Sequence, residues 1–291
     1  YAFDYANIPF RCLDSTTESR ATNGPMANWL RADLAATTNQ WIIAYWHHPP
    51  YSFGFHSSDD PGEVEMTQMR QNILPILEAG GVDLVLNGHN HIYERSYLLH
   101  GHYGVSTTLQ RGMILDRGSG RESETGAYLK PTSGPLANLG TVFVEVGCSA
   151  SLADPGDISR HPVLFDQELQ LGSLVLDINS NRLDAAFLRN TGVIGDSFTI
   201  IKQEPEPLRL DIAMRSGDVI LSWKSVAGHR YRIEHSVSQQ TPDWQSASDI
   251  ITAAGTVTVW TNPRSTGPLY LYRVVEVPPE FALGAAGALK A

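Results

Sequence analysis

The sequence predicts an α/β domain over residues 1–202, followed by a small all-β sandwich over residues 208–277. Two apolar runs at residues 41–46 and 82–87, with a segment of helical spacing between them, indicate a β-α-β unit in the first part. Short alternating segments separated by turn residues indicate antiparallel strands in the second part. A polar, proline-spaced linker at residues 203–207 separates the two parts.

Further elements are predicted on both sides of the β-α-β unit. A strand is expected at residues 8–13, and Gly24-Pro25 introduces an amphipathic helix. The helix of the β-α-β unit is expected at residues 63–80. Additional strands are predicted at residues 92–99, 141–146, 173–177, 182–188 and 197–201. The stretch at residues 100–139 has little periodicity and is predicted to be a long loop.

The second part is predicted to hold six or seven short strands. The alternation is clearest at residues 208–214, 218–223, 229–235, 257–260 and 269–275. Trp223 and Tyr231 are expected to fill the core of this sandwich. Residues 278–291 are rich in small side chains and form a tail without a predicted element.

Composition excludes some classes of protein. The net charge of −10 argues against a general nucleic-acid binder, whose surface is usually basic. No apolar run approaches the length needed to span a membrane. Cys12 and Cys148 are the only cysteines, too few for a disulfide framework or a zinc knuckle. They either pair or stay reduced, and their apolar, strand-like surroundings favour buried, reduced thiols.

Histidines follow both strands of the β-α-β unit. His47 and His48 end the first apolar run, and the turn Gly88-His89-Asn90-His91 follows the second. A right-handed crossover places both clusters at the same edge of the sheet, where α/β proteins bind their ligands. Neutral imidazole suits zinc, iron and manganese. We therefore predict that His47, His89 and His91 are metal ligands.

Residues close to these ligands in the sequence are predicted to orient them or to contact the substrate. His48 precedes Pro49-Pro50, which fix the loop around a single ligand, so His48 is expected to support the site from behind. His56 lies on the next loop, which can lean over the metal, and is expected to donate a proton or to bind an anionic substrate. Charged residues that follow a metal turn, here Glu94 and Arg95, usually orient it by hydrogen bonds.

These motifs resemble those of the calcineurin-like metallophosphoesterases, and most closely their purple acid phosphatase-like branch. The resemblance is carried by Trp46-His47-His48-Pro49-Pro50-Tyr51-Ser52 and Gly88-His89-Asn90-His91-Ile92-Tyr93-Glu94-Arg95-Ser96, and it extends over residues 1–202. It implies a four-layer α/β/β/α fold, of which this chain holds the carboxy-terminal part. It also implies the hydrolysis of phosphate esters, typically phosphomonoesters, with phosphodiesters as a further possibility.

The resemblance assigns a role to each histidine. It implies that His47 and His89 share one metal ion and that His91 binds the other. The implied cofactor is a pair of divalent or trivalent ions, with iron, zinc and manganese as alternatives. His56 falls where this branch places a histidine near the substrate phosphate and the leaving group.

One departure from the family bears on activity. The family's first three ligand blocks, which include the bridging aspartate, have no counterpart in this sequence. A two-metal phosphoesterase needs a bridging carboxylate to hold its ions and to generate the attacking hydroxide. We therefore expect a longer enzyme of which this chain is a fragment, inactive in isolation. Two alternatives stay open: a non-catalytic secreted carbohydrate- or surface-binding protein with a relic metal half-site, and a one-metal hydrolase that uses the three histidines.

The second part carries a weaker resemblance. Val219-Ile220-Leu221-Ser222-Trp223 and Tyr231-Arg232-Ile233-Glu234 are similar to segments of the fibronectin type III-like modules appended to secreted bacterial hydrolases. This resemblance implies a periplasmic or extracellular protein. The partners expected from the whole sequence are a phosphate ester substrate, no nucleic acid and no membrane span, with the oligomeric state left open.

Overall fold

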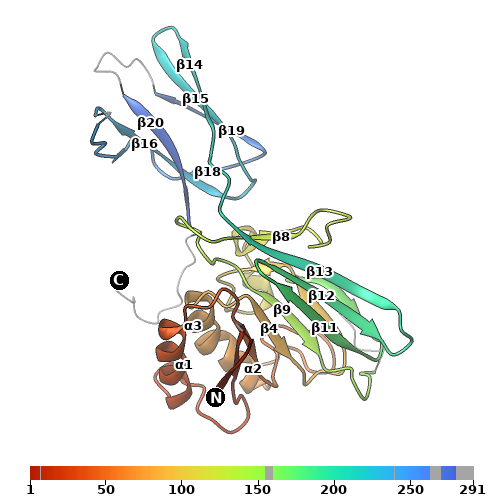
Figure 1. Cartoon of the computed structure of the whole chain (residues 1–291). Coiled ribbons are helices and arrows are strands. Elements are labelled where there is room, and N and C mark those ends of the chain that lie inside the picture. The colour runs from red at the N-terminus through yellow and green to blue at the C-terminus, as the bar shows by residue number, and fades with distance from the viewer. Residues whose placement is uncertain (7, 155–159, 239, 263–269, 280–291) are drawn as a thin grey trace. The chain divides into compact units, whose positions relative to one another are not determined.

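The computed structural model describes residues 1–6, 8–154, 160–238, 240–262 and 270–279 of the chain. The chain folds into two compact units (Figure 1). Unit 1 comprises Tyr1–Thr132 and Asn138–Gln203, and unit 2 comprises Ser133–Ala137 and Glu204–Ala291. Of the predicted tail, residues 280–291 lie outside the described residues.

Unit 1 is built on a seven-stranded sheet with the strand order β1-β2-β3-β4-β9-β5-β10. The strands are β1 (Ala2–Tyr5), β2 (Ile8–Cys12), β3 (Ile43–Tyr45), β4 (Leu84–Asn87), β9 (Val142–Val146), β5 (Tyr93–Ser96) and β10 (Leu164–Glu168). The four strands β2, β3, β4 and β9 are parallel to one another, and β1, β5 and β10 pair antiparallel at the edges. The parallel centre aligns the carboxyl ends of β3 and β4 at one edge of the sheet.

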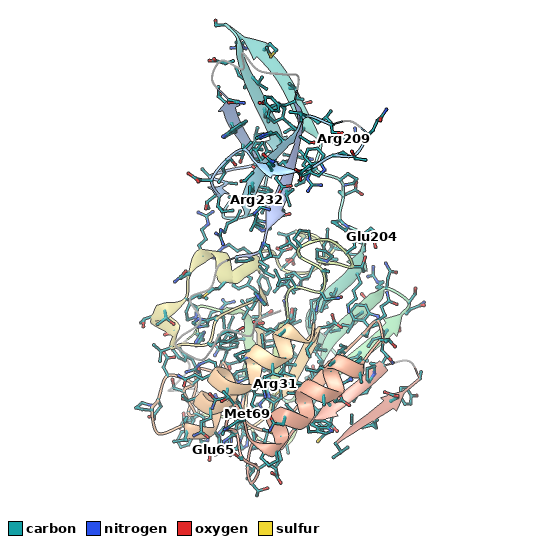
Figure 2. All side chains as sticks on the ribbon, turned by 90° about the vertical axis from the view of Figure 1, so that its left-hand side faces the viewer. Arg31, Glu65, Met69, Glu204, Arg209 and Arg232 are labelled. Atoms are coloured by element: carbon teal, nitrogen blue, oxygen red, sulfur yellow. The ribbon has the colours of Figure 1, made fainter. Side chains whose placement is uncertain are left out.

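Helices cover one face of this sheet. α1 (Pro25–Ala36) begins with a proline, whose missing N–H costs nothing at the first helical position. The predicted helix at 63–80 forms as α2 (Val64–Gln68), a π-helical turn (Met69–Ile73) and α3 (Leu74–Ala79). The change of winding precedes Pro75, which has no N–H to continue the α-helical ladder. Met69, labelled in Figure 2, is fully buried in the core beneath these helices.

A second sheet packs on the other face. It has the order β11-β12-β13-β8, with β11 (Gly172–Asn179), β12 (Arg182–Arg189), β13 (Ile194–Gln203) and β8 (Tyr128–Pro131). Between the sheets lies a core that includes Ile43 and Val142 from the first sheet and Phe187 and Ile200 from the second. The outer face of the second sheet exposes Val175. Unit 1 therefore has three packed layers, α/β/β, which confirms the predicted α/β sandwich.

The prediction of a long loop at residues 100–139 is partly wrong. It contains β7 (Ile114–Asp116), which pairs with β6 (Leu98–Leu99), and β8 of the second sheet, besides short 3₁₀ turns at Ser106–Thr108 and Arg111–Met113. In β8 the buried positions are Tyr128 and Lys130, while Leu129 is exposed. A buried lysine and an exposed leucine invert the usual pattern, so hydrophobic periodicity does not reveal this strand.

Lys130 is buried because it neutralises Asp83 at the start of β4. The Asp83 Oδ1 lies 2.6 Å from Lys130 Nζ and 2.8 Å from Lys202 Nζ, and all three side chains are almost fully buried. Asp83 Oδ2 also accepts the main-chain N–H of Ile42 at 2.8 Å. Burial lowers the pKa of Lys130 to about 8. This ionic cluster ties β4 to β8 and β13.

Unit 2 is a β-sandwich of two sheets, as the sequence predicts. One sheet has the order β14-β15-β19, with β14 (Leu210–Arg215), β15 (Asp218–Lys224) and β19 (Val257–Asn262). The other is built around β16 (Arg230–Ser236), which pairs with β17 (Gln245–Ser246), β18 (Ile251–Thr252) and β20 (Leu271–Val277). Trp223 and Tyr231 meet edge to face in the core, with their ring centroids 5.8 Å apart.

Cys12 and Cys148 are both free thiols, and Cys148 is buried. Within the described parts of the chain, no helix combines the length and apolar character needed to cross a bilayer.

Candidate metal centre

The histidines that follow β3 and β4 meet at the carboxyl edge of the sheet. Tyr45 pairs with Leu86 at the ends of these parallel strands, so the residues beyond them emerge side by side. The main-chain N–H of Gly88 donates to the carbonyl of His47 at 3.0 Å. His89 Nδ1 then lies 3.1 Å from His47 Nε2. The crossover thus brings two histidines from distant parts of the sequence into direct contact.

Two groups of side chains in the described residues offer ligand atoms within 4.8 Å of one another, and both contain His89. The first group is His47, His48 and His89. The second group is His56, Glu63 and His89. The ring centroid of His89 lies 4.9 Å from that of His47, 4.4 Å from His48 and 4.0 Å from His56. His89 is therefore the residue that the two groups share.

The two ring nitrogens of His89 face different groups. Nδ1 faces His47, while Nε2 lies 3.5 Å from Glu63 Oε2. Glu63 also holds His56, because its Oε1 lies 2.6 Å from His56 Nδ1. His89 Nε2 is buried and makes no hydrogen bond. A buried ring nitrogen without a hydrogen-bond partner loses free energy that a bound cation would restore.

Charge states favour a cation at this place. Desolvation, followed by the nearby histidines, lowers the pKa of His89 to about 4. Desolvation also lowers the pKa of His48. Both rings are consequently neutral near pH 7, and a neutral imidazole has the lone pair that a metal ion needs. The four imidazoles and one carboxylate that the two groups offer suit zinc, iron or manganese.

The turn that carries His89 has a constrained backbone. His89 has a φ of 82°, a left-handed conformation that is uncommon for residues with a β-carbon and is frequent at functional sites. The next residue, Asn90, donates its main-chain N–H to Glu145 Oε1 at 2.7 Å and its amide to Ser52 Oγ at 2.8 Å. A β-carbon at Gly147 would come within 1.9 Å of the Asn90 carbonyl oxygen, so glycine is required at this position directly after β9, where the chain approaches the turn.

His91 lies outside both groups. Its side chain is exposed, and its Nδ1 contacts Ser151 Oγ at 2.7 Å. Its carbonyl accepts the main-chain N–H of Ala153 at 2.8 Å. The structure therefore places two of the three predicted ligands, His47 and His89, in one group, and adds His48, for which a supporting role was expected.

Glu94 and Arg95 lie behind the turn in different surroundings. Glu94 Oε1 accepts hydrogen bonds from the main-chain N–H of Phe53 at 3.3 Å and from Gln167 at 2.7 Å. Arg95 instead pairs with the buried Asp196 of the second sheet, with Nη2 and Oδ1 2.9 Å apart. Glu94 thus contacts the loop that carries His56, whereas the hydrogen bonds of Arg95 go to the second sheet.

Glu94 and Glu145 form a buried acid pair beneath the site. Desolvation raises the pKa of both carboxyl groups, and the pKa of Glu145 is raised further by the charge of Glu94. Both pKa shifts therefore oppose the simultaneous ionisation of these two buried carboxyl groups. Since Glu145 contacts the turn at Asn90 and Glu94 contacts Phe53, the pair links the two segments that carry His89 and His56.

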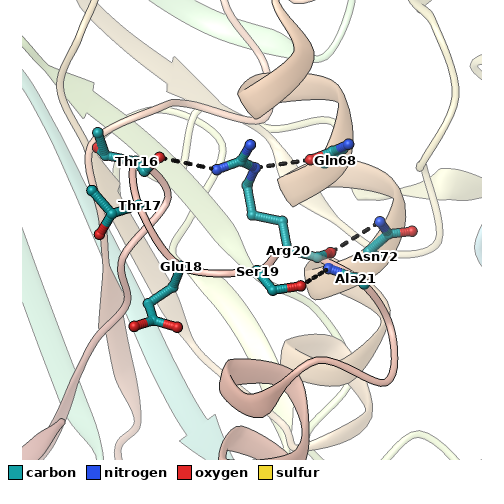
Figure 3. A pocket seen from close by; sticks show the side chains of 8 residues that line it. All are labelled: Thr16, Thr17, Glu18, Ser19, Arg20, Ala21, Gln68 and Asn72. Atoms are coloured by element: carbon teal, nitrogen blue, oxygen red, sulfur yellow. Dashed lines mark hydrogen bonds between the residues drawn. The ribbon is translucent and has the colours of Figure 1, made fainter.

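His48 is held from the other side by the loop after β2. The Ser15 hydroxyl lies 2.9 Å from His48 Nδ1 and accepts the His48 main-chain N–H at 3.2 Å. Arg20 fixes this loop by donating to the Ser15 carbonyl at 2.8 Å and to Gln68 of α2 at 2.9 Å. Figure 3 shows Arg20 reaching across a polar pocket between the loop and the helix. Every Arg20 nitrogen has a protein partner, so we interpret this pocket as part of the support for His48.

Sequence reasoning missed three contributors: Glu63, Glu145 and Ser15. Glu63 stands directly before α2, where an acidic residue is ordinarily explained by the helix dipole. Glu145 offered a usable signal, because it is a charged residue inside the otherwise apolar strand β9. Ser15 offered none, since its contact with His48 depends on the packing of β2 beside β3.

Comparison with known proteins matches residues 5–93 to the family model described as calcineurin-like phosphoesterase. Purple acid phosphatase 18 of Arabidopsis thaliana is 32% identical over 99 residues, covering 33% of this chain and 21% of that protein. An uncharacterized protein of Mycobacterium tuberculosis (strain H37Rv) is 33% identical over 219 residues, covering 62% of this chain and 39% of that protein. The chain thus spans well under half the length of these relatives.

A solved structure shows the same fold. The purple acid phosphatase from yellow lupin (Lupinus luteus) seeds superposes with a TM-score of 0.52 at 19% identity, covering 70% of this chain and 32% of that chain. The residues matched by the family model include every member of the two ligand groups. Residues 5–93 are therefore similar to calcineurin-like phosphoesterases, and purple acid phosphatases are among the relatives of this chain.

Proposed function

We propose that this chain is part of a metal-dependent phosphoric ester hydrolase of the acid phosphatase-like kind, acting on phosphomonoesters. The observation that supports this most strongly is the contact of His47 with His89, whose facing nitrogens lie 3.1 Å apart within the matched residues. Imidazole nitrogens that face each other in this way can both serve as ligands of one cation. The purple acid phosphatase relatives favour phosphate ester hydrolysis over other metal-assisted reactions.

The residues of this chain would hold metal in two places. We propose His47 and His89 as ligands of one ion, with His48 close enough to join them, and His91 as a ligand of a second ion, as in a dinuclear centre. Iron, zinc and manganese all suit imidazole ligands. When bound, such ions stabilise charge on a phosphoryl group and lower the pKa of water.

The chain's own residues would handle substrate and proton. His56 is the proposed proton donor to the leaving group, because Glu63 Oε1 lies 2.6 Å from its Nδ1 and orients the ring. The acid pair Glu94–Glu145 would hold the His56 loop and the His89 turn in fixed positions relative to each other.

Glu63 is the only carboxylate in the two ligand groups, and it is already engaged by His56. A two-metal centre requires a carboxylate that bridges its ions. We therefore expect residues 1–291 alone to bind metal but to hydrolyse phosphate esters slowly. The full activity would need ligands beyond the two groups described.

The test combines metal content with hydrolysis of p-nitrophenyl phosphate in the presence of manganese, zinc or iron. We expect His89→Ala to lower metal affinity at least about 100-fold, because it removes a ligand from both groups. His235→Ala in unit 2 is the matched control and should leave metal binding unchanged. Metal affinity that is equal in the two variants would refute the proposed site. Rapid turnover by the unmodified chain that His89→Ala abolishes would support the enzyme class but refute the expected inactivity of the isolated chain.

We further propose that unit 2 is a fibronectin type III-like module and that the protein acts in the periplasm or outside the cell. The support is its two-sheet sandwich of short strands around Trp223 and Tyr231. Fractionation of the source cells tests the location, and recovery of the protein in the cytoplasmic fraction would contradict it.

A further inference from the structure

The strand β14 forms an uncovered edge of unit 2. It is the terminal strand in the order β14-β15-β19, and its other side pairs with no strand in the described residues. Five of its six residues are exposed, including Ile212 at 58% and Met214 at 65%. Exposed edge strands are usually protected by lysine, proline or bulges. β14 contains no lysine and no proline.

The two faces of β14 differ in chemistry. Ile212 pairs with Leu221 and Met214 pairs with Val219, so both belong to the core-facing side of the sheet. They remain exposed although their partners on β15 are buried. Asp211 and Arg215 lie on the opposite face with the alternate residues of the strand. The edge therefore presents apolar side chains on one face and two opposite charges on the other.

We infer that β14 pairs antiparallel with β14 of a second copy of this chain, about a twofold axis through Ala213. This pairing places Asp211 of each copy opposite Arg215 of the other, and Ile212 of each copy opposite Met214 of the other. Main-chain hydrogen bonds would join the two three-stranded sheets into one continuous sheet. A twofold axis perpendicular to the sheet keeps core-facing side chains on one side, as an isologous interface requires.

The charges select this register over its neighbours. Registers that keep the faces matched differ by steps of two residues. The register centred on Ile212 sets Arg209 of each copy, labelled in Figure 2 just before β14, opposite Arg215 of the other. The register centred on Asp211 sets Asp211 of one copy opposite Asp211 of the other. The register centred on Met214 sets Asp211 opposite Gly217 without an ion pair, and the register centred on Arg215 sets Arg215 opposite Arg215. Among these registers, the one centred on Ala213 pairs opposite charges twice.

The expected association is weak and depends on concentration. Each cross-strand pair of opposite charges or apolar side chains contributes about 0.2–1 kcal/mol. Arg215 keeps its neighbour Asp218 on β15 within its own chain, so it would lie between two acidic side chains in the dimer. Salt should weaken the dimer, because exposed ion pairs are screened.

Sedimentation velocity of the intact chain over a range of concentrations tests the inference. We expect a monomer–dimer equilibrium that Asp211→Arg weakens about tenfold or more, since it replaces two attractive contacts by two repulsive ones. Asp249→Arg is the control, because it makes the same charge change at an exposed residue outside β14. It should leave the dimer unchanged.

A charge-reversal variant separates the pairing from misfolding. Asp211→Arg, Arg215→Asp and Asp218→Arg together restore both contacts between copies and keep residue 215 opposite an opposite charge on β15. We expect this variant to dimerise like the unmodified chain. A chain that is monomeric at every concentration, or a dimer equally stable with Asp211→Arg and with Asp249→Arg, would overturn the inference. Protection of the β14 edge amides from hydrogen exchange in a monomer would likewise overturn it, by showing that the edge is covered within one chain.

Discussion

Two clusters of polar side chains in unit 1 differ in how their members are paired. In the cluster of Asp83, Lys130 and Lys202, each charge has a partner of opposite sign within 2.8 Å. In the histidine groups, His89 Nε2 is buried without a hydrogen bond, and the facing nitrogens of His47 and His89 lie 3.1 Å apart. The first cluster is complete by itself and stabilises the fold. For the second we propose a cation as the missing partner.

The sharpest test of this contrast is Asp83→Asn, which leaves two buried ammonium groups without their counter-charge. Breaking one side of a buried ionic cluster costs about 3–5 kcal/mol in the free energy of unfolding. Urea denaturation at neutral pH measures it. The exposed Asp177→Asn is the control and should change the free energy of unfolding by less than about 0.5 kcal/mol. Equal effects of the two substitutions would show that the cluster does not hold the three strands together.

His102 is a second histidine without hydrogen bonds, but its surroundings predict an effect on the pH dependence of stability and not a binding site. Both of its ring nitrogens lack a hydrogen bond, yet the ring is fully buried and stacks on Tyr51 with the centroids 5.5 Å apart. Burial, followed by the charge of Arg70, lowers its pKa to about 4. The unfolded chain takes up the proton near pH 6.5, whereas the folded protein does not. Stability should therefore fall as the pH drops from about 6.5 to about 4, and this contribution should be constant above that range.

In the His102→Leu variant, the free energy of unfolding should fall by about 1.4 kcal/mol less per pH unit over this range than in the unmodified chain. Urea midpoints measured across the acidic range give the slope. His161, whose pKa is lowered to about 3 by burial and then by the charge of His102, contributes a second slope of the same sign that remains in the variant. An unchanged slope in His102→Leu would mean that His102 is already charged in the folded protein.

The smallest expected effect concerns the support of the histidine groups. Ser15→Ala removes the hydroxyl that contacts His48 Nδ1 and should lower metal affinity by up to about tenfold, with little change in the free energy of unfolding. Calorimetric titration with zinc or manganese measures the affinity. Ser19→Ala, in the same loop but without contact to a histidine, is the control. Equal affinities of the two variants would remove Ser15 from the site.

Parts of this fold were predictable because their side chains follow simple rules. The runs before His47 and Gly88 are continuously apolar, as strands covered on both faces must be, and the segment between them repeats at helical spacing. The right-handed crossover then fixes which edge carries the histidines. The strand β8 was not predictable in this way, because its inward residue Lys130 is explained only by Asp83, which is distant in the sequence.

The site was predictable to the extent that it depends on strands. The positions of His47 and His89 follow from β3 and β4, whose register a β-α-β unit constrains. The contact of His56 with Glu63, the outward position of His91 and the left-handed backbone of His89 all depend on loop conformation. Loops carry no periodic pattern, so their geometry arises from contacts such as Asn90 with Glu145.

The position of His89 between two groups has a consequence for how the site fills. One imidazole has two nitrogens but a single ring orientation and one protonation equilibrium, so a cation bound on the Nδ1 side changes the basicity of the Nε2 side that faces Glu63. Occupancies of the two sides are thermodynamically linked, and the linkage is reciprocal. A binding isotherm for this chain should therefore deviate from that of independent sites, and its cooperativity would report on a single side chain.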